Sequence, residues 1–242
     1  MRAKCLLSTA IVLNSLVGTV LTEPATASPP TSISGAPNVF GSVALPVKHS
    51  RYSTRWLRVA EGAHSPLLES LVRPAKELNR GQKSMFVNSA LNLRLTYRFD
   101  THPSGDHWAS ASETLAKSAG DCEDIVIAKM QALRALGIPA RDLFMTIGTD
   151  AAIGAVHAVL LVRDGSRFWV LENRSNRLMA HETYRDFYPI LTFSGSQTWL
   201  HGYKRGTTPA PVRALDAARI AQAENLPIGS SRGSAVAIGA GR

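Results

Sequence analysis

Residues 120–139, with the sequence GDCEDIVIAKMQALRALGIP, decide the fold of this chain. Asp121 is a residue type that caps helices, and apolar residues then recur at i, i+4, i+7 and i+10, which predicts a helix over residues 122–136. Gly137 ends this helix, and the proline two residues later prevents it from resuming. The cysteine in this stretch therefore stands in the first turn of an amphipathic helix.

The segments around this helix differ in their apolar period. Helical spacing is found in two segments, residues 66–95, with a break near Gly81, and residues 110–117. Strand periodicity predicts five further segments, at residues 142–148, 157–163, 167–171, 190–193 and 199–203. Residues 39–47 fit an edge strand or an extended entry segment. Helices followed by a run of strands predict an α+β fold, with the cysteine helix packed on an antiparallel sheet.

The start of the chain has the pattern of a secretory signal peptide over residues 1–27. A basic beginning precedes an uncharged apolar stretch, and Ala25-Thr26-Ala27 forms a small-x-small cleavage site. The apolar stretch is shorter than the ~20 residues of a membrane span and contains polar residues, which disfavours a membrane anchor. We therefore expect a periplasmic protein. The rest of the chain divides into a linker at 28–37, a folded domain at 38–205 and a disordered tail at 206–242.

The net charge of +9 arises from 27 Lys and Arg against 18 Asp and Glu. These basic residues are scattered singly, without a run of five or six and without interleaved aromatic residues, so no nucleic-acid partner is expected. A solvated basic surface explains the charge. Apart from His157, which is discussed below, the histidines lack the spacing of metal ligands. We expect His181 and His201 at the surface.

Cysteine usage is informative because the chain has two cysteines, Cys5 and Cys122, and the first leaves with the signal peptide. One thiol in an exported protein indicates a reactive group or an intermolecular bridge, and a buried inert cysteine is the alternative. A helix N-terminus lowers the pKa of a thiol, whereas the adjacent Asp121, Glu123 and Asp124 oppose that shift. A nearby imidazolium or a bound cation then has to compensate.

His157 begins a predicted strand, from which an imidazole can reach a helix N-terminus packed on the sheet. Asp164-Gly165 is a hairpin signal, and a turn centred on these two residues places Glu172 directly opposite His157. A slip of one residue would bring Asn173 there instead. These residues predict a thiol nucleophile, an imidazole base and a third group that orients the imidazole.

Several short motifs carry a resemblance to a known family. They are FG at 40–41, DHWA at 106–109, GDCED at 120–124, ALGIPA at 135–140, HAVL at 157–160, WVLEN at 169–173 and YP at 188–189. With these motifs, residues 38–203 resemble the bacterial transglutaminase-like cysteine proteinases, whose best-known branch is the LapG-type periplasmic proteases.

The resemblance implies a papain-like α+β fold and an exported cysteine endopeptidase with a Cys-His-Asp triad. On this sequence Cys122 is the nucleophile, His157 the base and Glu172 the residue at the acid position. The resemblance also implies a calcium site that uses Asp121 and Glu123, and cleavage of large surface adhesins near their N-termini, at sequences of small residues. The partners expected are such a protein substrate and an inner-membrane receptor, with a monomeric enzyme and no organic cofactor.

The acid position departs from the family pattern, because the family usually has Asp where this chain has Glu172. Misplacing a catalytic group by about 1 Å can cost ~100-fold in rate. Three outcomes are open. The backbone compensates for the longer side chain of Glu172, or Asn173 orients the His157 imidazole instead, or activity is reduced or lost. The alternative functions are a protein transglutaminase or amidase, which uses the same acyl-thioester chemistry, and a catalytically inactive peptide-binding module.

Overall fold

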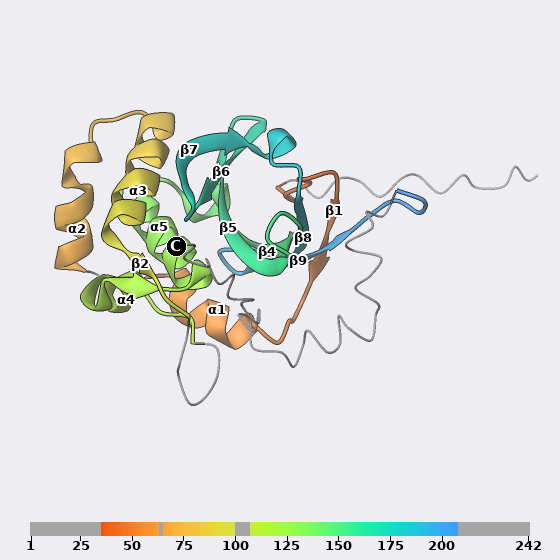
Figure 1. Ribbon diagram of the computed structural model, residues 1–242, viewed down its shortest axis with the longest axis horizontal. Coiled ribbons are helices and arrows are strands. Elements are labelled where there is room, and N and C mark those ends of the chain that lie inside the picture. Colours follow the sequence, from red (N-terminus) through yellow and green to blue (C-terminus); the bar gives the residue numbers. More distant parts are fainter. Residues whose placement is uncertain (1–34, 63–64, 100–106, 208–242) are drawn as a thin grey trace, which may run out of the picture. The chain divides into compact units, whose positions relative to one another are not determined.

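Helices cover one side of an antiparallel sheet in the computed structural model, which describes residues 35–62, 65–99 and 107–207 (Figure 1). The predicted signal peptide, residues 28–34 of the predicted linker, and the predicted tail beyond residue 207 lie outside the described residues. None of the helices in these ranges has the length and the apolar composition of a membrane span.

The described ranges contain five α-helices, which are α1 (Ser53–Ala60), α2 (Pro66–Val72), α3 (Arg80–Arg94), α4 (Ala111–Lys117) and α5 (Cys122–Ala135). Seven strands form the main sheet in the order β1-β9-β8-β4-β5-β6-β7. Their bounds are β1 (Val43–Val47), β4 (Leu143–Asp150), β5 (Ala155–Asp164), β6 (Arg167–Glu172), β7 (Ser175–Ala180), β8 (Phe187–Ser194) and β9 (Gln197–Gly202). A small parallel pair consists of β2 (Thr96–Tyr97) and β3 (Ala119–Gly120). The sequence did not predict α1 or β7.

The break between the helices of residues 66–95 lies earlier than predicted, because Gly81 falls in the first turn of α3. Asn79 caps this helix by accepting a hydrogen bond from the Gln82 backbone N–H at 3.0 Å, and Gln82 Oε1 accepts from the Asn79 N–H at 3.1 Å. This reciprocal capping box satisfies two backbone donors and fixes the start of α3.

Helix α5 is the central helix of the domain. Asp121 is its N-cap, as predicted, and the helix ends at Ala135 with Leu136 as the C-cap. All residues from Cys122 to Leu133 are buried, so α5 is enclosed on every side. The nucleophile predicted from the sequence therefore stands at the beginning of the most deeply buried helix.

Strand β5 contributes side chains to two hydrophobic cores. Ala158, Leu160 and Val162 belong to the core beneath the helices, whereas Val159 and Leu161 belong to a second core on the other face of the sheet. This alternation follows from the period of two in a strand, and it explains the nearly continuous apolar sequence of β5.

The hairpin between β5 and β6 has a different register from the predicted one. Asp164 pairs with Arg167, so the turn is Gly165-Ser166, and Gly165 has the positive φ of 61° that such a turn requires. Continuing the observed pairing of Leu160 with Leu171 places Glu172 two residues away from the predicted position opposite His157. Because two residues are one full strand period, both side chains still share a face of the sheet.

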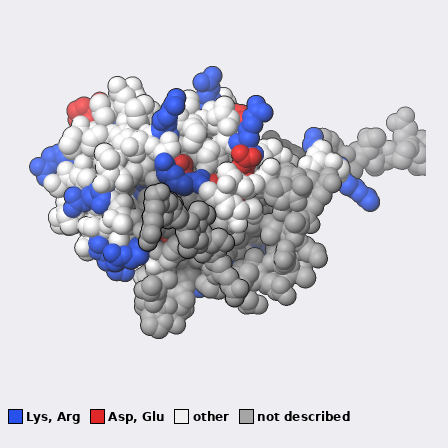
Figure 2. All heavy atoms as spheres, in the orientation of Figure 1, with Lys and Arg blue, Asp and Glu red and all other residues white. Residues whose placement is uncertain are grey.

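Basic side chains are dispersed over the visible surface, as expected, and acidic ones lie among them (Figure 2). The expectation of a surface position for His201 was wrong, since its side chain is buried in the sheet. Its Nδ1 lies 2.7 Å from Ser42 Oγ and its Nε2 lies 2.8 Å from Thr192 Oγ1. These two hydroxyl groups give each ring nitrogen of the buried imidazole a hydrogen-bond partner.

Candidate active site

The start of α5 is fixed by close packing. A Cβ atom on Gly120 would lie 2.6 Å from Asp124 Cβ, so a side chain at position 120 does not fit. Asp121 caps the helix by accepting the Asp124 backbone N–H at 3.2 Å, and Asp124 Oδ1 accepts the Ala109 N–H at 2.7 Å. These contacts hold Cys122 at the first helical position.

The thiol of Cys122 is buried and donates a hydrogen bond to Glu123 Oε2 at 2.8 Å. Burial raises the pKa of this thiol well above its ordinary value, and Glu123 and Asp121 raise it further, whereas the backbone of Ala158 lowers it. Burial and the adjacent acids therefore outweigh the effect of the helix N-terminus on the pKa of this thiol, in the direction in which these acids were expected to act. The contact with Ala158 nevertheless places the sulfur beside the residue that follows His157.

His157 and Glu172 are brought together across the sheet. Glu172 Oε2 lies 3.7 Å from His157 Nε2, and both side chains are buried. Nε2 has no hydrogen-bond partner among the described residues, because 3.7 Å is longer than a hydrogen bond. Within the same ranges the thiol bonds to Glu123 and not to the imidazole.

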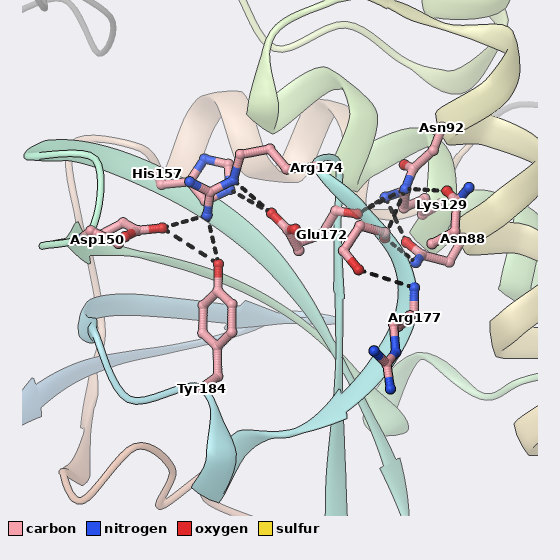
Figure 3. Close-up of polar contacts among 12 residues, drawn as sticks. Asn88, Asn92, Lys129, Asp150, His157, Glu172, Arg174, Arg177 and Tyr184 are labelled. Carbon is pink, nitrogen blue, oxygen red and sulfur yellow. Dashed lines mark hydrogen bonds and ion pairs between the residues drawn. The ribbon is translucent and has the colours of Figure 1, made fainter.

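Arg174 binds the same oxygen of this carboxylate (Figure 3). Its Nε donates to Glu172 Oε2 at 2.9 Å, and its guanidinium also bonds to Asp150 Oδ2 and, at 2.8 Å, to Tyr184 Oη. Burial raises the pKa of Glu172, but His157 and Arg174 together bring it below its ordinary value. The acid is therefore held as a carboxylate next to the imidazole.

The sequence did not identify Arg174, Asp150 or Tyr184. They come from separate segments, and only the charge of Asp150 at the end of the apolar strand β4 was a local signal. Asn173, the alternative orienting residue, has a buried Oδ1 that lacks a hydrogen-bond partner within the described ranges. The structure therefore brings Glu172, and not Asn173, to His157.

Asp121 and Glu123 supply buried carboxylates beside the thiol, with 5% and 1% of their surfaces exposed. Carboxylate oxygens are the donors that Ca²⁺ prefers, so the donor chemistry fits the implied calcium. The described residues contain no group of three or more His, Cys, Asp or Glu arranged to hold a metal ion. Calcium takes six to eight oxygen ligands, so backbone carbonyls or water would have to complete the set.

The family model described as bacterial transglutaminase-like cysteine proteinase matches residues 41–201, which contain all of these residues. The chain belongs to this family. It is therefore a transglutaminase-like cysteine peptidase, as the sequence motifs predicted. No curated protein matches the chain significantly.

Solved structures show the same fold for this transglutaminase-like cysteine peptidase. Legionella pneumophila LapG is 23% identical with a TM-score of 0.51, covering 61% of this chain and 87% of that chain. Its calcium-bound form is 22% identical with a TM-score of 0.51, covering 67% and 96%. Its EGTA-treated form is 21% identical with a TM-score of 0.50, covering 67% and 95%. The predicted transglutaminase-like α+β fold is confirmed.

Proposed function

We propose that this peptidase is an exported endopeptidase that uses Cys122 as nucleophile, His157 as base and Glu172 as the acid that orients the imidazole. One observation carries this assignment. The buried contact between His157 and Glu172 lies at the end of β5 where the start of α5 places its thiol against Ala158. Thiol nucleophile, base and orienting group are the three parts that such catalysis needs.

The orientation of the imidazole assigns the roles of its nitrogens. Because Nε2 of His157 faces Glu172, Nδ1 takes the thiol proton as Sγ attacks the peptide carbonyl and a C–S bond forms. The negative oxygen accepts from the Cys122 backbone N–H, which has no intrahelical partner at the first helical position. The C–N bond then breaks, and His157 returns the proton to the leaving amine.

Hydrolysis of the thioester regenerates the enzyme. His157 takes a proton from water as the water oxygen attacks the acyl carbon, the C–S bond breaks, and the proton returns to sulfur. The first attack requires the thiol to exchange Glu123 for the imidazole as its acceptor. The bond from Cys122 to Glu123 is thus that of a resting thiol.

Asp121 and Glu123 are the proposed calcium ligands. Asp121 and Glu123 raise the pKa of the Cys122 thiol, and a calcium ion held by these carboxylates would supply positive charge that offsets them. The chemistry of these buried oxygens supports the assignment, as does the existence of LapG in calcium-bound and EGTA-treated forms.

The proposed location is the periplasm, and the proposed substrate is a large surface adhesin or another envelope protein. The signal-peptide pattern of residues 1–27 supports export. The motif resemblance supports the adhesin substrate and an inner-membrane receptor as partner. We propose a monomeric enzyme.

A purified-protein assay tests the proposed activity. A quenched-fluorescence peptide with a central Ala-Ala pair is incubated with the full chain in calcium, and the wild type is compared with Cys122→Ala and His157→Ala. We expect cleavage by the wild type and a loss of at least about 1,000-fold in either variant, because these residues act as a unit. Cleavage that persists in folded Cys122→Ala contradicts the proposal.

Transamidation is measured in parallel as incorporation of dansylcadaverine into N,N-dimethylcasein. Incorporation that exceeds hydrolysis would assign the chain to the transglutaminase alternative. Binding of the peptide without hydrolysis or incorporation would assign it to an inactive module.

A further inference from the structure

Lys129 is fully buried in α5, at 0% exposure, seven residues after Cys122 and hence on the same face of the helix. Lysine is almost never fully buried unless its charge is paired. Among the described residues no carboxylate forms an ion pair with Lys129. Burial lowers the pKa of this ammonium to about 7, although Glu172 acts in the opposite direction.

Packing alone does not account for a lysine at this position. Methionine or leucine would fill similar space without the cost of removing an ammonium from water. The ammonium instead makes two specific contacts, since Nζ donates to Asn88 Oδ1 at 2.8 Å and to the backbone carbonyl of Glu172 at 3.0 Å. The second contact joins the helix that carries the thiol to the residue that carries the acid.

Asparagines on α3 hold the same turn (Figure 3). Asn92 Nδ2 donates to the carbonyls of Glu172 and Ser175, each at 3.0 Å, and Asn88 Nδ2 donates to Ser175 at 2.8 Å. The Glu172 carbonyl therefore accepts from both Lys129 and Asn92. A backbone held at this atom fixes where the Glu172 side chain leaves the strand.

Regular backbone hydrogen bonding between β6 and β7 does not hold the turn that joins them. The β6–β7 register shifts between Val170 and Glu172, so the strand pairing is irregular just where the acid lies. Side-chain donors from two helices replace the missing regularity. The acid itself reaches its imidazole only at 3.7 Å, so a small backbone movement changes the contact substantially.

We infer that Lys129, together with Asn92, is a positioning residue of the active site, which holds the Glu172 carbonyl so that its carboxylate meets His157. This inference rests on the proposed triad. Lys129 touches neither substrate nor the reacting atoms, and it acts through the backbone of Glu172. It couples the position of the nucleophile helix to the position of the acid.

A double-mutant cycle tests this inference with the Ala-Ala peptide and the full chain in calcium. Lys129→Met keeps the length of the side chain and removes its donors. We expect kcat to fall at least about 10-fold with KM within about twofold, because displaced catalytic groups reduce rate more than binding. In a Glu172→Ala background, adding Lys129→Met should change kcat by less than about twofold, since the residue through which it acts is gone.

Lys83→Met is the matched control. Lys83 Nζ donates to the carbonyl of Leu136 at 3.1 Å, which is also a lysine–carbonyl contact but at the other end of α5. We expect its kcat to equal that of the wild type. If Lys129→Met does not fold by near-UV circular dichroism, Asn92→Ala is carried through the same cycle, because it removes the other donor to the Glu172 carbonyl.

The outcomes separate the two proposals. Wild-type kcat in a folded Lys129→Met or Asn92→Ala variant overturns the positioning role and leaves the triad intact. If Lys129→Met lowers kcat by the same factor in the Glu172→Ala background as in the wild type, the positioning role is also overturned, because the effect of Lys129 then does not depend on Glu172. A wild type that cleaves no better than Cys122→Ala overturns the proposed function, and the positioning role falls with it.

Discussion

Glu172 reaches His157 diagonally across the β5–β6 hairpin, with Oε2 3.7 Å from Nε2. Diagonal positions in a sheet lie roughly 7–8 Å apart at Cα, farther than directly opposed ones. The longer side chain of glutamate spans that gap. The extra methylene of Glu172, relative to the aspartate that the family resemblance implies, therefore extends its carboxylate toward the imidazole along this diagonal.

The first prediction concerns the length of this acid. Glu172→Asp should lower kcat about 10- to 100-fold, because the shorter carboxylate is withdrawn from the imidazole by about one bond length. Glu172→Gln keeps the reach but removes the charge, and we expect a smaller loss. The measurement is steady-state cleavage of the Ala-Ala peptide. An aspartate variant as active as the wild type would show that reach is not limiting.

The second prediction concerns Arg174, which with His157 keeps the pKa of Glu172 below its ordinary value against the effect of burial. Because the pKa of Glu172 is lower in the folded protein than in the unfolded chain, its ionisation stabilises the fold at pH values above the unfolded pKa. This stabilisation is lost as the pH falls through the folded pKa. Arg174→Met should raise the pKa of Glu172 and move the acid limb of kcat/KM to higher pH. The neighbouring Arg177→Met, which loses an exposed side chain, should leave the pH profile unchanged.

The third prediction concerns Gly120, where an added Cβ would meet Asp124 at 2.6 Å. Gly120→Ala should destabilise the protein by about 1–3 kcal/mol through overpacking and reduce cleavage by displacing the start of α5. Gly81→Ala is the control, since an added Cβ there would meet Asn79 Oδ1 at 3.7 Å, an ordinary van der Waals distance. In a helix this control should stabilise by about 0.5–1 kcal/mol. Urea denaturation monitored by circular dichroism measures both.

The fourth prediction concerns calcium. Adding calcium to the purified wild type should raise Tm in proportion to the logarithm of its concentration, because a ligand that binds the folded state stabilises it. Glu123→Gln should abolish most of this increase. The exposed Glu61→Gln, which removes a surface partner of Arg134, should retain it in full. Equal increases in both variants would exclude Glu123 as a ligand.

The fifth prediction concerns His201, whose pKa is lowered by burial from 6.5 to about 4. Between these values the unfolded chain binds a proton that the folded chain does not, so stability falls as pH decreases from about 6.5 to 4. The shift corresponds to about 3 kcal/mol. His201→Gln should flatten this part of the stability profile, whereas the exposed His49→Gln should not. Urea unfolding across this pH range provides the comparison.

Local sequence determined helix α5, its Asp121 cap, the cysteine at its first position and the strands that follow. These features depend on backbone and side-chain interactions over about four residues, or on a simple apolar period, which a sequence displays directly. The motifs around Cys122, His157 and Glu172 also sufficed to identify the family. The helix break near Gly81 was misplaced because capping by Asn79 outweighs the low helix propensity of glycine.

Tertiary structure alone decided how the candidate site is held. The turn of the β5–β6 hairpin differs by one residue from the predicted turn, and only strand pairing shows that His157 and Glu172 meet diagonally. The roles of Arg174 and Lys129 are invisible in sequence, because each contacts groups on other segments. The raised pKa of the thiol likewise follows from burial and from carboxylates gathered around it, and such long-range solvation is set by the folded chain as a whole.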